Sequence, residues 1–469
     1  MKIFSFIFVK MNLIEILING GGFMYTSIDL FAGPGGLATG FMWSGIKPLI
    51  AVEMSYWTVQ TYSASHDAEI FDLESFLSGT MENPEKFFRK SERTLLIYGD
   101  INKVSNDLIS KILKQRFGVD SVDIVTGGAP CESFSMAGKR EDGDERDDLF
   151  LNILRIARHV KSKMVLFENV KGLLSKRSNG KSVFKNICDE FESTAYDTSF
   201  CLASRDPHQI LLTASHYGVP QNRERIFLVG INRNYNATFR YPLPTHGPNR
   251  MFPYVTVGDA LLDLPEVRPG EEVTEYTFNL SDHTLSEQRR DFLLKMRGVT
   301  LSVPKHLAFH ENSLTSHKAV NHREKMVKRM ELIHQGENMK TAAERLISEN
   351  REDLRRELFP NKLYGARNRR LREDTPSFTV TSHCLDEMIH PFQHRGLTPR
   401  EAARLQSFPD WYIFEGPFVK FHSDPEQDRY EQIGDAIPPL LAYALGQEVV
   451  NTLNMIYNQM ENNIEYIIC

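Results

Sequence analysis

The sequence predicts an α/β protein with a mostly parallel sheet and a smaller, irregular second domain. Over residues 25–245, short apolar runs alternate with amphipathic segments. This alternation is typical of βαβ units, in which helices cover both faces of a parallel sheet. Residues 265–375 are polar and charged with weak periodicity, and the clean helical pattern returns at Leu397. We therefore expect a discontinuous core of residues 24–245 and 386–469, and a second domain of residues 246–385.

The predicted strands of the core follow one another at regular intervals. They are residues 25–30, 48–52, 94–98, 122–126 and 164–167, with helical segments at 41–44, 56–64, 104–116 and 149–160. Three further strands, at 193–203, 209–214 and 225–231, have no long helices between them. Parallel strands need long crossovers, so we expect antiparallel pairing at this end of the sheet. Residues 71–93 look like a polar insertion.

Two helices are predicted near the end of the chain. Thr398 is a suitable N-cap, and Pro399 fits the first helical position, so a helix should begin there. Residues 440–457 have the apolar periodicity of a long helix.

Composition narrows the class of protein. The chain has 469 residues, 41% of them hydrophobic and 25% charged, as in an ordinary globular protein. The formal net charge of -6 gives no sign of nucleic-acid binding, so a DNA-binding face would need local clusters of basic residues. The five cysteines lack metal-binding spacing, which predicts free thiols in a reducing cytoplasm and no metal site. No apolar run reaches about 18 residues, so no membrane span is expected.

The first 23 residues differ from the rest. They are apolar, are interrupted by Lys10 and Glu15, and lack a small-residue cleavage site, which argues against a signal peptide. The first predicted strand begins at Tyr25, directly after Met24. We therefore expect residues 1–23 to be an extension and translation to start at Met24. Natively expressed protein that begins at Met1 would contradict this.

Three predicted strands end in residues suited to binding or catalysis. A glycine turn at 33–36 follows the first strand, where glycines let the backbone approach a ligand closely. Cys131 follows Pro130 in a Gly/Ser-rich loop after the strand 122–126, and Glu168 ends the next strand. Cys131 or Glu168 alone would more often be structural, and a glycine turn alone can also be purely structural. Their order along the chain points to a shared function.

Together with three later segments, these motifs resemble those of the DNA (cytosine-5) methyltransferase family, of the bacterial restriction-modification type. The matching segments are Asp29-Leu30-Phe31-Ala32-Gly33-Pro34-Gly35-Gly36, Pro130-Cys131, Phe167-Glu168-Asn169-Val170, Gln221-Asn222-Arg223-Glu224-Arg225, 397–409 and Gly434-Asp435-Ala436-Ile437-Pro438-Pro439. They occur in the family's order and cover about 25–245 and 377–458. The resemblance implies a Rossmann-like methyltransferase core and a smaller target-recognition domain. It gives the segment 397–409 a structural role.

The resemblance implies S-adenosyl-L-methionine as the cofactor. Glu53 ends the second strand, where a carboxylate can hold both ribose hydroxyls, and Asp100 would face the adenine. The implied cofactor-binding residues are Phe31, Ala32, Gly33, Gly35, Gly36, Glu53, Met54, Asp100, Ile101, Pro130, Asp435 and Ala436. Asp435 stands where the family has Asn, which alters the hydrogen bonds expected at that position.

The resemblance also assigns the catalytic roles. The Cys131 thiolate would attack carbon 6 of cytosine, which makes carbon 5 nucleophilic. Glu168, with a pKa raised by burial, would donate to ring nitrogen 3. Arg225 would reach the cytosine O2, Arg223 would organise the loop and contact backbone phosphates, and Asn169 would brace the turn.

DNA contacts are expected from two regions. A target carbon inside a duplex is out of reach, so the cytosine must flip out, and Ser135, Lys139 and Arg140 lie on the loop that closes over it in the family. In the recognition domain the expected phosphate or base contacts are Lys362, Arg367, Arg369 and Arg370. A second basic cluster at 322–329 is more simply a solvated helix face.

The sequence thus predicts methyl transfer to carbon 5 of cytosine in a specific double-stranded DNA sequence. We expect a monomer that serves a restriction-modification system, with a cognate endonuclease encoded nearby but not stably bound. A tRNA cytosine methyltransferase is an alternative, although that group has little in place of the long basic segment. A silent DNA-binding regulator would not need Cys131, Glu168 and Arg225. A nicotinamide-dependent dehydrogenase would have no use for the proline-cysteine loop.

Overall fold

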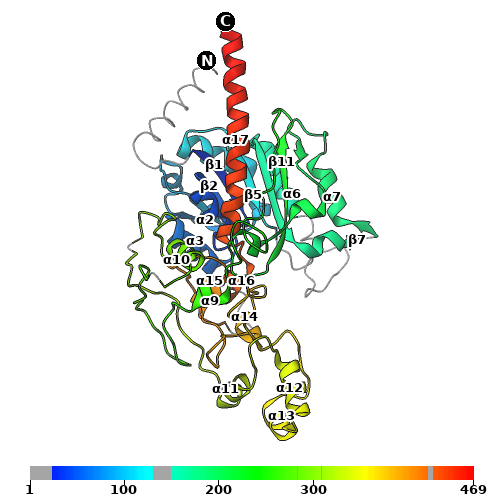
Figure 1. The fold of residues 1–469 in the computed structure, drawn as a ribbon. Helices are drawn as coiled ribbons and strands as arrows, with labels where there is room; N and C mark the ends of the chain where they lie inside the picture. The colour runs from blue at the N-terminus through cyan, green and yellow to red at the C-terminus, as the bar shows by residue number, and fades with distance from the viewer. Residues whose placement is uncertain are drawn as a thin grey trace.

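The computed structural model describes residues 24–129, 149–178, 180–282, 284–307, 309–420 and 426–468, with the backbone alone from residue 463 onward. Its upper part is a nine-stranded sheet with helices on both faces, and a lower part rich in loops extends from one edge of that sheet (Figure 1). The predicted α/β class and the mostly parallel sheet are confirmed.

The sheet is parallel at its centre and antiparallel at one end. Its strand order is β10-β11-β6-β5-β1-β2-β4-β3, and β9 pairs with β11 beside this path. The parallel strands are β1 (Tyr25–Leu30), β2 (Ile46–Glu53), β3 (Glu69–Asp72), β4 (Leu95–Tyr98), β5 (Ile124–Gly127) and β6 (Met164–Val170). β11 (Glu224–Asn232) runs antiparallel to β6, β9 (Phe200–Leu202) and β10 (Leu211–Thr213), as predicted for this end.

Different helices cover the two faces because successive strand residues point in opposite directions. Ile124, Met164 and Leu166 pack on the face covered by α2 (Gly36–Trp43) and α17 (Pro439–Ile468). Val125 and Val165 pack on the other face. The helices there are α5 (Asn106–Ile112), α6 (Phe150–His159) and α7 (Val183–Phe191), while α3 (Tyr56–His66) packs over β2 and β4.

The segment expected to be a polar insertion contains regular structure. It includes the end of the edge strand β3, the helix α4 (Leu73–Leu77) and the 3₁₀ helix η1 (Pro84–Phe88). Phe71, Phe87 and Phe88 are buried against one another, so this segment closes the sheet edge with its own aromatic cluster. The buried phenylalanines do not fit the polar character expected of this insertion. The strand 209–214 also begins as helix α8 (Pro207–Ile210) before β10.

The long helix α17 joins the end of the chain to its beginning. It runs along the sheet beside α2, and its far end projects beyond the sheet (Figure 1). A Cβ on Gly40 would overlap the backbone of Tyr443 and Pro439, so glycine permits the close approach of α2 and α17. At the other edge of the sheet, Tyr457 donates to Asp123 at 2.6 Å. Neither α17 nor any other helix in the described part of the chain could cross a bilayer.

The lower part of the molecule contains short helices separated by loops. They are α9 (Val257–Leu261), α10 (Glu287–Met296), α11 (Glu324–Glu331), α12 (Met339–Ser348), α13 (Glu352–Leu358) and α14 (Cys384–Glu387), with a strand pair β12 (Arg369–Arg370) and β13 (Met388–Ile389). Apolar side chains of α9 and α10 pack into the main core, whereas those of α11, α12 and α13 form a small cluster of their own.

Buried ion pairs join the lower part to the core through α15 (Pro399–Leu405) and the segment leading to α16 (Arg429–Asp435). Arg404 has no exposed side-chain surface and pairs with Asp263 at 2.9 Å and with Asp410 at 2.6 Å. Arg395 and Glu401 form a second buried pair at 2.7 Å, and Arg395 Nε also donates to the Val267 carbonyl of the lower part at 3.0 Å. Buried charges must be paired to be tolerated, so these contacts fix the register between the two parts. The segment 397–409 thus has structural contacts.

Candidate active site

The glycine turn after β1 is held by the carboxylate that ends β2. Glu53 Oε2 accepts from the Gly33 N–H at 2.9 Å, and Oε1 accepts from the N–H groups of Met54 and Ser55 at 2.7 and 2.9 Å. Burial raises the pKa of Glu53, and these three backbone hydrogen bonds oppose that rise. Phe31 has a φ of 54° and Gly33 a φ of 56°, so the turn is tight on both sides of Ala32. The carboxylate therefore shapes the turn.

The turn is packed on one side and open on the other. A Cβ on Gly35 would overlap the His66 ring and lie 2.8 Å from the Tyr412 hydroxyl, and one on Gly36 would overlap the Ile437 carbonyl. A Cβ on Gly33 would meet no atom within 4 Å. The side at Gly33 is thus open to a ligand, next to the Glu53 carboxylate.

A buried polar cluster lies beneath the turn. Tyr412 donates its hydroxyl to the Pro34 carbonyl, and His66 Nε2 lies 3.0 Å from Thr39 Oγ1. Burial lowers the pKa of His66 to about 4, so its ring is neutral. Asp29 is buried, accepts from Thr126 at 2.8 Å, and has a pKa that burial raises to about 7. The floor of the turn therefore depends on side chains from four elements, β1, α2, α3 and β5, and on Tyr412 from the segment after α15.

The other residues predicted to bind the cofactor follow the same carboxyl edge of the sheet. Asp100 comes after β4 and accepts from the Asn102 N–H at 2.9 Å, and Ile101 is buried beside it. Met54 follows Glu53 and is 67% exposed. Asp435 ends α16 and accepts from Gln427 at 2.8 Å, and Ala436 is buried next to it. Pro130 lies outside the described residues.

Three residues that the sequence did not indicate also lie here. Tyr56 begins α3, Tyr98 ends β4, and their ring centroids are 6.0 Å apart. Glu426 Oε2 accepts from the Tyr56 N–H at 2.7 Å and from Ser55 Oγ at 3.1 Å, so it caps α3 directly after Glu53 and Met54. The positions of Tyr56 and Tyr98 at strand and helix ends could have suggested them. Glu426 is far away in sequence and gave no such signal.

Glu168 and Arg225 face each other across neighbouring strands. Glu168 lies near the end of β6 and Arg225 at the start of β11, and Arg225 Nε is 3.0 Å from Glu168 Oε1. Their side chains are 12% and 14% exposed. Burial raises the pKa of Glu168, while Arg225 and Arg223 oppose this, and the net shift is upward. A Cβ on Gly128 would lie 2.8 Å from Glu168 Oε2, so the carboxyl occupies space that only glycine leaves free.

Asn169 links this carboxyl to the loop that carries Cys131. Its Nδ2 donates to the Ala129 carbonyl at 3.2 Å, and its Oδ1 accepts from the Val170 N–H at 2.9 Å. Asn169 thus holds the last described residue before the loop beside Glu168. Cys131 itself lies outside the described residues, as do Ser135, Lys139 and Arg140.

Arg223 points inward. It is 1% exposed, and its guanidinium donates to the Val380 carbonyl at 2.9 Å. Gln221 donates to Gln406 Oε1 at 2.7 Å and accepts from the Val380 N–H at 2.7 Å. These contacts tie the start of β11 to residues near 380, in agreement with an organising role. The burial of Arg223 does not favour the phosphate contact also expected from it.

The basic residues of the lower part have unequal surroundings. Lys362 and Arg367 are exposed on either side of Tyr364. Arg369 is half-buried over the Phe378 ring and lies 3.4 Å from Glu387. Arg370 is 4% exposed and donates to the carbonyls of Met330, Ile333, His390, Pro391 and Gln393. Its expected DNA contact is corrected to a structural role, because its donors are occupied inside the protein.

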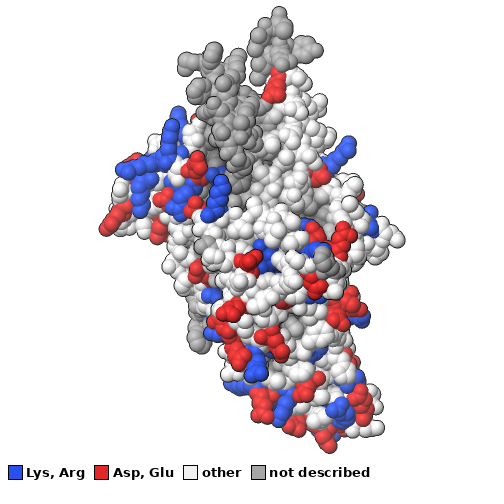
Figure 2. Space-filling model, turned by 60° about the vertical axis from the view of Figure 1, so that its left-hand side comes forward, with Lys and Arg blue, Asp and Glu red and all other residues white. Residues whose placement is uncertain are grey.

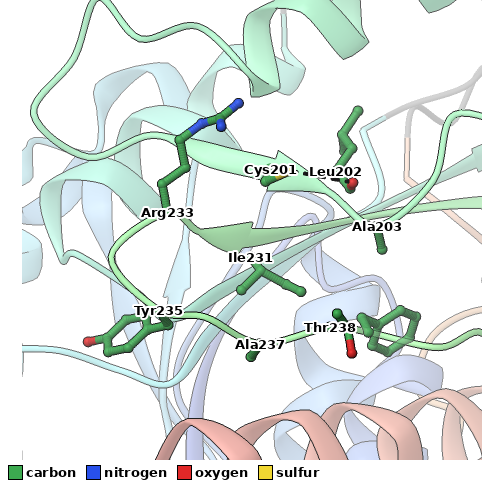
Figure 3. A pocket seen from close by; sticks show the side chains of 9 residues that line it. Cys201, Leu202, Ala203, Ile231, Arg233, Tyr235, Ala237 and Thr238 are labelled. Carbon is green, nitrogen blue, oxygen red and sulfur yellow. Dashed lines mark hydrogen bonds between the residues drawn. The ribbon is translucent and has the colours of Figure 1, made fainter. Parts of the chain in front are cut away.

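The pocket in Figure 3 does not belong to this site. It is lined by β9, the end of β11 and residues 235–239, and includes Cys201 and Arg233. Ile231 in this lining pairs with Met164 at the start of β6, whereas Glu168 lies toward the other end of that strand. The pocket therefore lies near the amino end of β6, away from Glu168, and none of the predicted site residues lines it.

Comparisons with known proteins agree with this geometry. The model of the C-5 cytosine-specific DNA methylase family matches residues 25–88 and 80–451. The chain is 30% identical over 427 residues to the type II methyltransferase M.DdeI of Desulfomicrobium norvegicum, covering 90% of this chain and 88% of that relative. It is 28% identical to the type II methyltransferase M.AgeI of Thalassovita gelatinovora, covering 90% and 98%.

A solved structure described as a DNA modification methyltransferase encoded within an E. coli prophage has the same fold. Its TM-score is 0.63 at 23% identity, and the match covers 92% of this chain and 99% of that one. The chain belongs to the C-5 cytosine-specific DNA methylase family, and it transfers a methyl group from S-adenosyl-L-methionine to carbon 5 of cytosine in DNA.

Proposed function

We propose that this enzyme methylates a flipped-out cytosine through a covalent adduct with Cys131, with Glu168 as the acid. The observation that carries the proposal is the buried Glu168 carboxyl beside Arg225, held next to the segment that leads to Cys131. The Cys131 sulfur forms a bond to carbon 6, and the ring electrons move to carbon 5. A protonated Glu168 donates to ring nitrogen 3 as this charge develops. Arg225 holds the cytosine O2.

S-adenosyl-L-methionine supplies the electrophilic methyl group when it is bound. The open side of the turn at Gly33 and the Glu53 carboxylate fit its methionine and ribose parts, and Asp100 and Ile101 fit its adenine. After transfer, carbon 5 loses its proton to a base, and the bond between carbon 6 and Cys131 breaks to restore the aromatic ring and the thiolate.

The target sequence is read by the domain expected at residues 246–385. Lys362, Arg367 and Arg369 contact DNA there, and Ser135, Lys139 and Arg140 contact it from the loop after Cys131. The similarity to type II methyltransferases supports a restriction-modification role, with a cognate endonuclease as the functional partner. The enzyme acts as a cytoplasmic monomer and forms no stable complex with that endonuclease.

Bisulfite sequencing of plasmid DNA from a methylation-free host tests the function. Expression of this chain should protect cytosines within one short sequence, and the Cys131→Ser variant should protect none while it still binds that sequence. Methylation by the variant would remove Cys131 as the nucleophile. If soluble, cofactor-binding wild-type protein protects no cytosine, DNA is not the substrate, and tRNA becomes the next one to test.

A further inference from the structure

The segment between the catalytic strand β6 and helix α7 is basic and contains no acid. Five basic residues lie between Val170 and Cys188, and no Asp or Glu occurs among them. They are Lys171, Lys176, Arg177, Lys181 and Lys185, and we call this stretch the basic hairpin segment. It begins two residues after Asn169, and the sequence motifs of the family did not draw attention to it.

The segment has a defined conformation. The 3₁₀ helix η5 (Lys171–Ser175) continues directly from β6, and β7 (Arg177–Ser178) then pairs antiparallel with β8 (Lys181–Ser182). Gly180, just before β8, has a φ of 75°, which glycine adopts without strain. Ser182 then caps α7 by accepting from the Lys185 N–H at 3.3 Å. In Figure 1 the hairpin projects sideways from the core, at the level where the lower part of the molecule begins.

The five basic residues of this segment have different surroundings, and Lys176 is buried. Lys171 pairs with Glu224 at 3.0 Å. Arg177, Lys181 and Lys185 are exposed, and in the described part of the chain no carboxylate lies within ion-pair distance of them. The nearest acids along α7 are already paired, since Glu190 binds Arg158 and Asp189 binds Arg205.

Basic residues on the helices of the lower part differ in this respect. Lys328 pairs with Glu324 at 2.7 Å and Arg356 with Glu352 at 3.1 Å, each within its own helix. On the face in Figure 2, blue and red side chains are accordingly mixed over this part. Paired charges of this kind attract a phosphate backbone weakly. The exposed charged side chains of the hairpin are all positive, so they should attract it more strongly.

We propose that the basic hairpin segment contacts the DNA phosphate backbone beside the target cytosine and holds the duplex against the catalytic edge. Val170 pairs with Arg225 in the sheet, so the segment starts at the active site. Five residues of 3₁₀ helix rise about 10 Å, or about three base-pair steps of DNA. Arg177 and Lys181 are therefore positioning residues for the duplex that flanks the flipped base, and they do not touch that base.

The salt dependence of DNA binding tests this proposal. The logarithm of the DNA-binding constant falls linearly with the logarithm of the salt concentration, and each phosphate contact makes this fall steeper by about 0.9. The Arg177→Ala/Lys181→Ala variant should therefore have a slope that is less steep than that of wild type by about 1.8. The variant should therefore bind DNA more weakly than wild type at low salt. The ratio of the two affinities should fall by roughly tenfold when salt is raised from about 50 to about 200 mM. The variant's kcat at saturating DNA should stay within about twofold of wild type, because neither residue reaches the reacting atoms.

Two matched variants separate charge from structure. Arg89→Ala/Lys90→Ala removes two exposed charges near η1, at the far end of the sheet, and should leave the slope unchanged. Arg177→Lys/Lys181→Arg keeps both charges and should retain the wild-type slope. An unchanged slope in the alanine hairpin variant, or an equal fall in the Arg89/Lys90 variant, would overturn the proposal. Because wild type is measured alongside, failure of methylation itself would be visible separately.

Discussion

At Glu168, burial and two arginines act on the same carboxyl in opposite directions. Burial disfavours the charged form and is the larger effect, whereas Arg225 and Arg223 favour it. The carboxyl thus lies beside the Arg225 guanidinium, and its pKa is still above that of an ordinary glutamate. Such a group can donate a proton at a pH where a free glutamate could not.

The pH dependence of kcat should report this balance. The active form of Glu168 is protonated, so kcat should fall as pH rises through its pKa, at a pH above the ordinary glutamate value of about 4.3. Glu168→Gln should lower kcat by about 10²- to 10⁴-fold and abolish this falling limb. Arg225→Met removes the main influence that lowers the pKa, so the limb should move to higher pH. A falling limb unchanged in Glu168→Gln would assign it to another group.

Single residues were predicted best where a motif fixes both type and place. Glu168, Asn169 and Glu53 lie at strand ends as expected, because a strand end is readable from local apolar pattern. Arg370 could not be judged in this way. Its guanidinium is surrounded by carbonyls from residues 330–393, and no local feature distinguishes it from the exposed Arg367.

Among elements, the turn between β1 and α2 depends most on distant parts of the chain. Glu53, at the end of β2, accepts a hydrogen bond from Gly33 in the turn. His66 and Tyr412 pack against Gly35, and Ile437 packs against Gly36. The turn is therefore a joint product of the first and last segments of the core.

Gly35→Ala should impair cofactor binding. Its Cβ would overlap the His66 ring, and its φ of 96° is unfavourable for alanine. We expect the Kd for S-adenosyl-L-methionine, measured by calorimetry, to rise at least about tenfold, with a loss of stability of about 1–3 kcal/mol. Gly45→Ala is the control, because its φ of 88° imposes similar strain but its Cβ meets no atom within 4 Å. Equal effects in both variants would mean that strain alone matters.

Most elements of the core were predictable because parallel strands buried on both faces form continuous apolar runs. The edge strand β3 was missed because it lacks such a run. Its sequence, Glu-Ile-Phe-Asp, is short and only partly buried. Aromatic residues that pack around it come from α4 and η1, so its strand character depends on contacts that sequence periodicity does not record. In the lower part, the loops are held by ion pairs, so their sequences have little hydrophobic periodicity from which helices and strands could be predicted.

On the scale of the whole molecule, α17 holds the two ends of the core together. Tyr457, near the middle of α17, donates to Asp123 at 2.6 Å. Lys163, just before β6, donates to the same carboxylate at 2.9 Å, and the Thr26 N–H donates to it at 2.8 Å. Burial raises the pKa of Tyr457, so its hydroxyl keeps the proton that it donates. This cluster lies at the amino edge of the sheet, remote from Glu168.

Tyr457→Phe should destabilise the fold without changing the chemistry. A hydrogen bond to a charged, buried carboxylate contributes about 1.5–3 kcal/mol, so the free energy of unfolding should fall by about that amount in urea denaturation. The kcat should remain within about twofold of wild type. Tyr443→Phe, on the same helix and without a hydroxyl contact in the described structure, should be close to neutral. A large loss of kcat in Tyr457→Phe would instead connect this cluster to the active site.

The packing of α2 against α17 also sets an order of events during synthesis. The ribosome makes Gly40 about 400 residues before its partner Tyr443, which corresponds to about 20–80 s at about 5–20 residues per second. For most of that interval the glycine turn lacks Tyr412 and Ile437, which pack against it. A nascent chain that has not yet reached Ile437 therefore cannot complete the packing of this turn, and cofactor binding should appear only after that residue has been made.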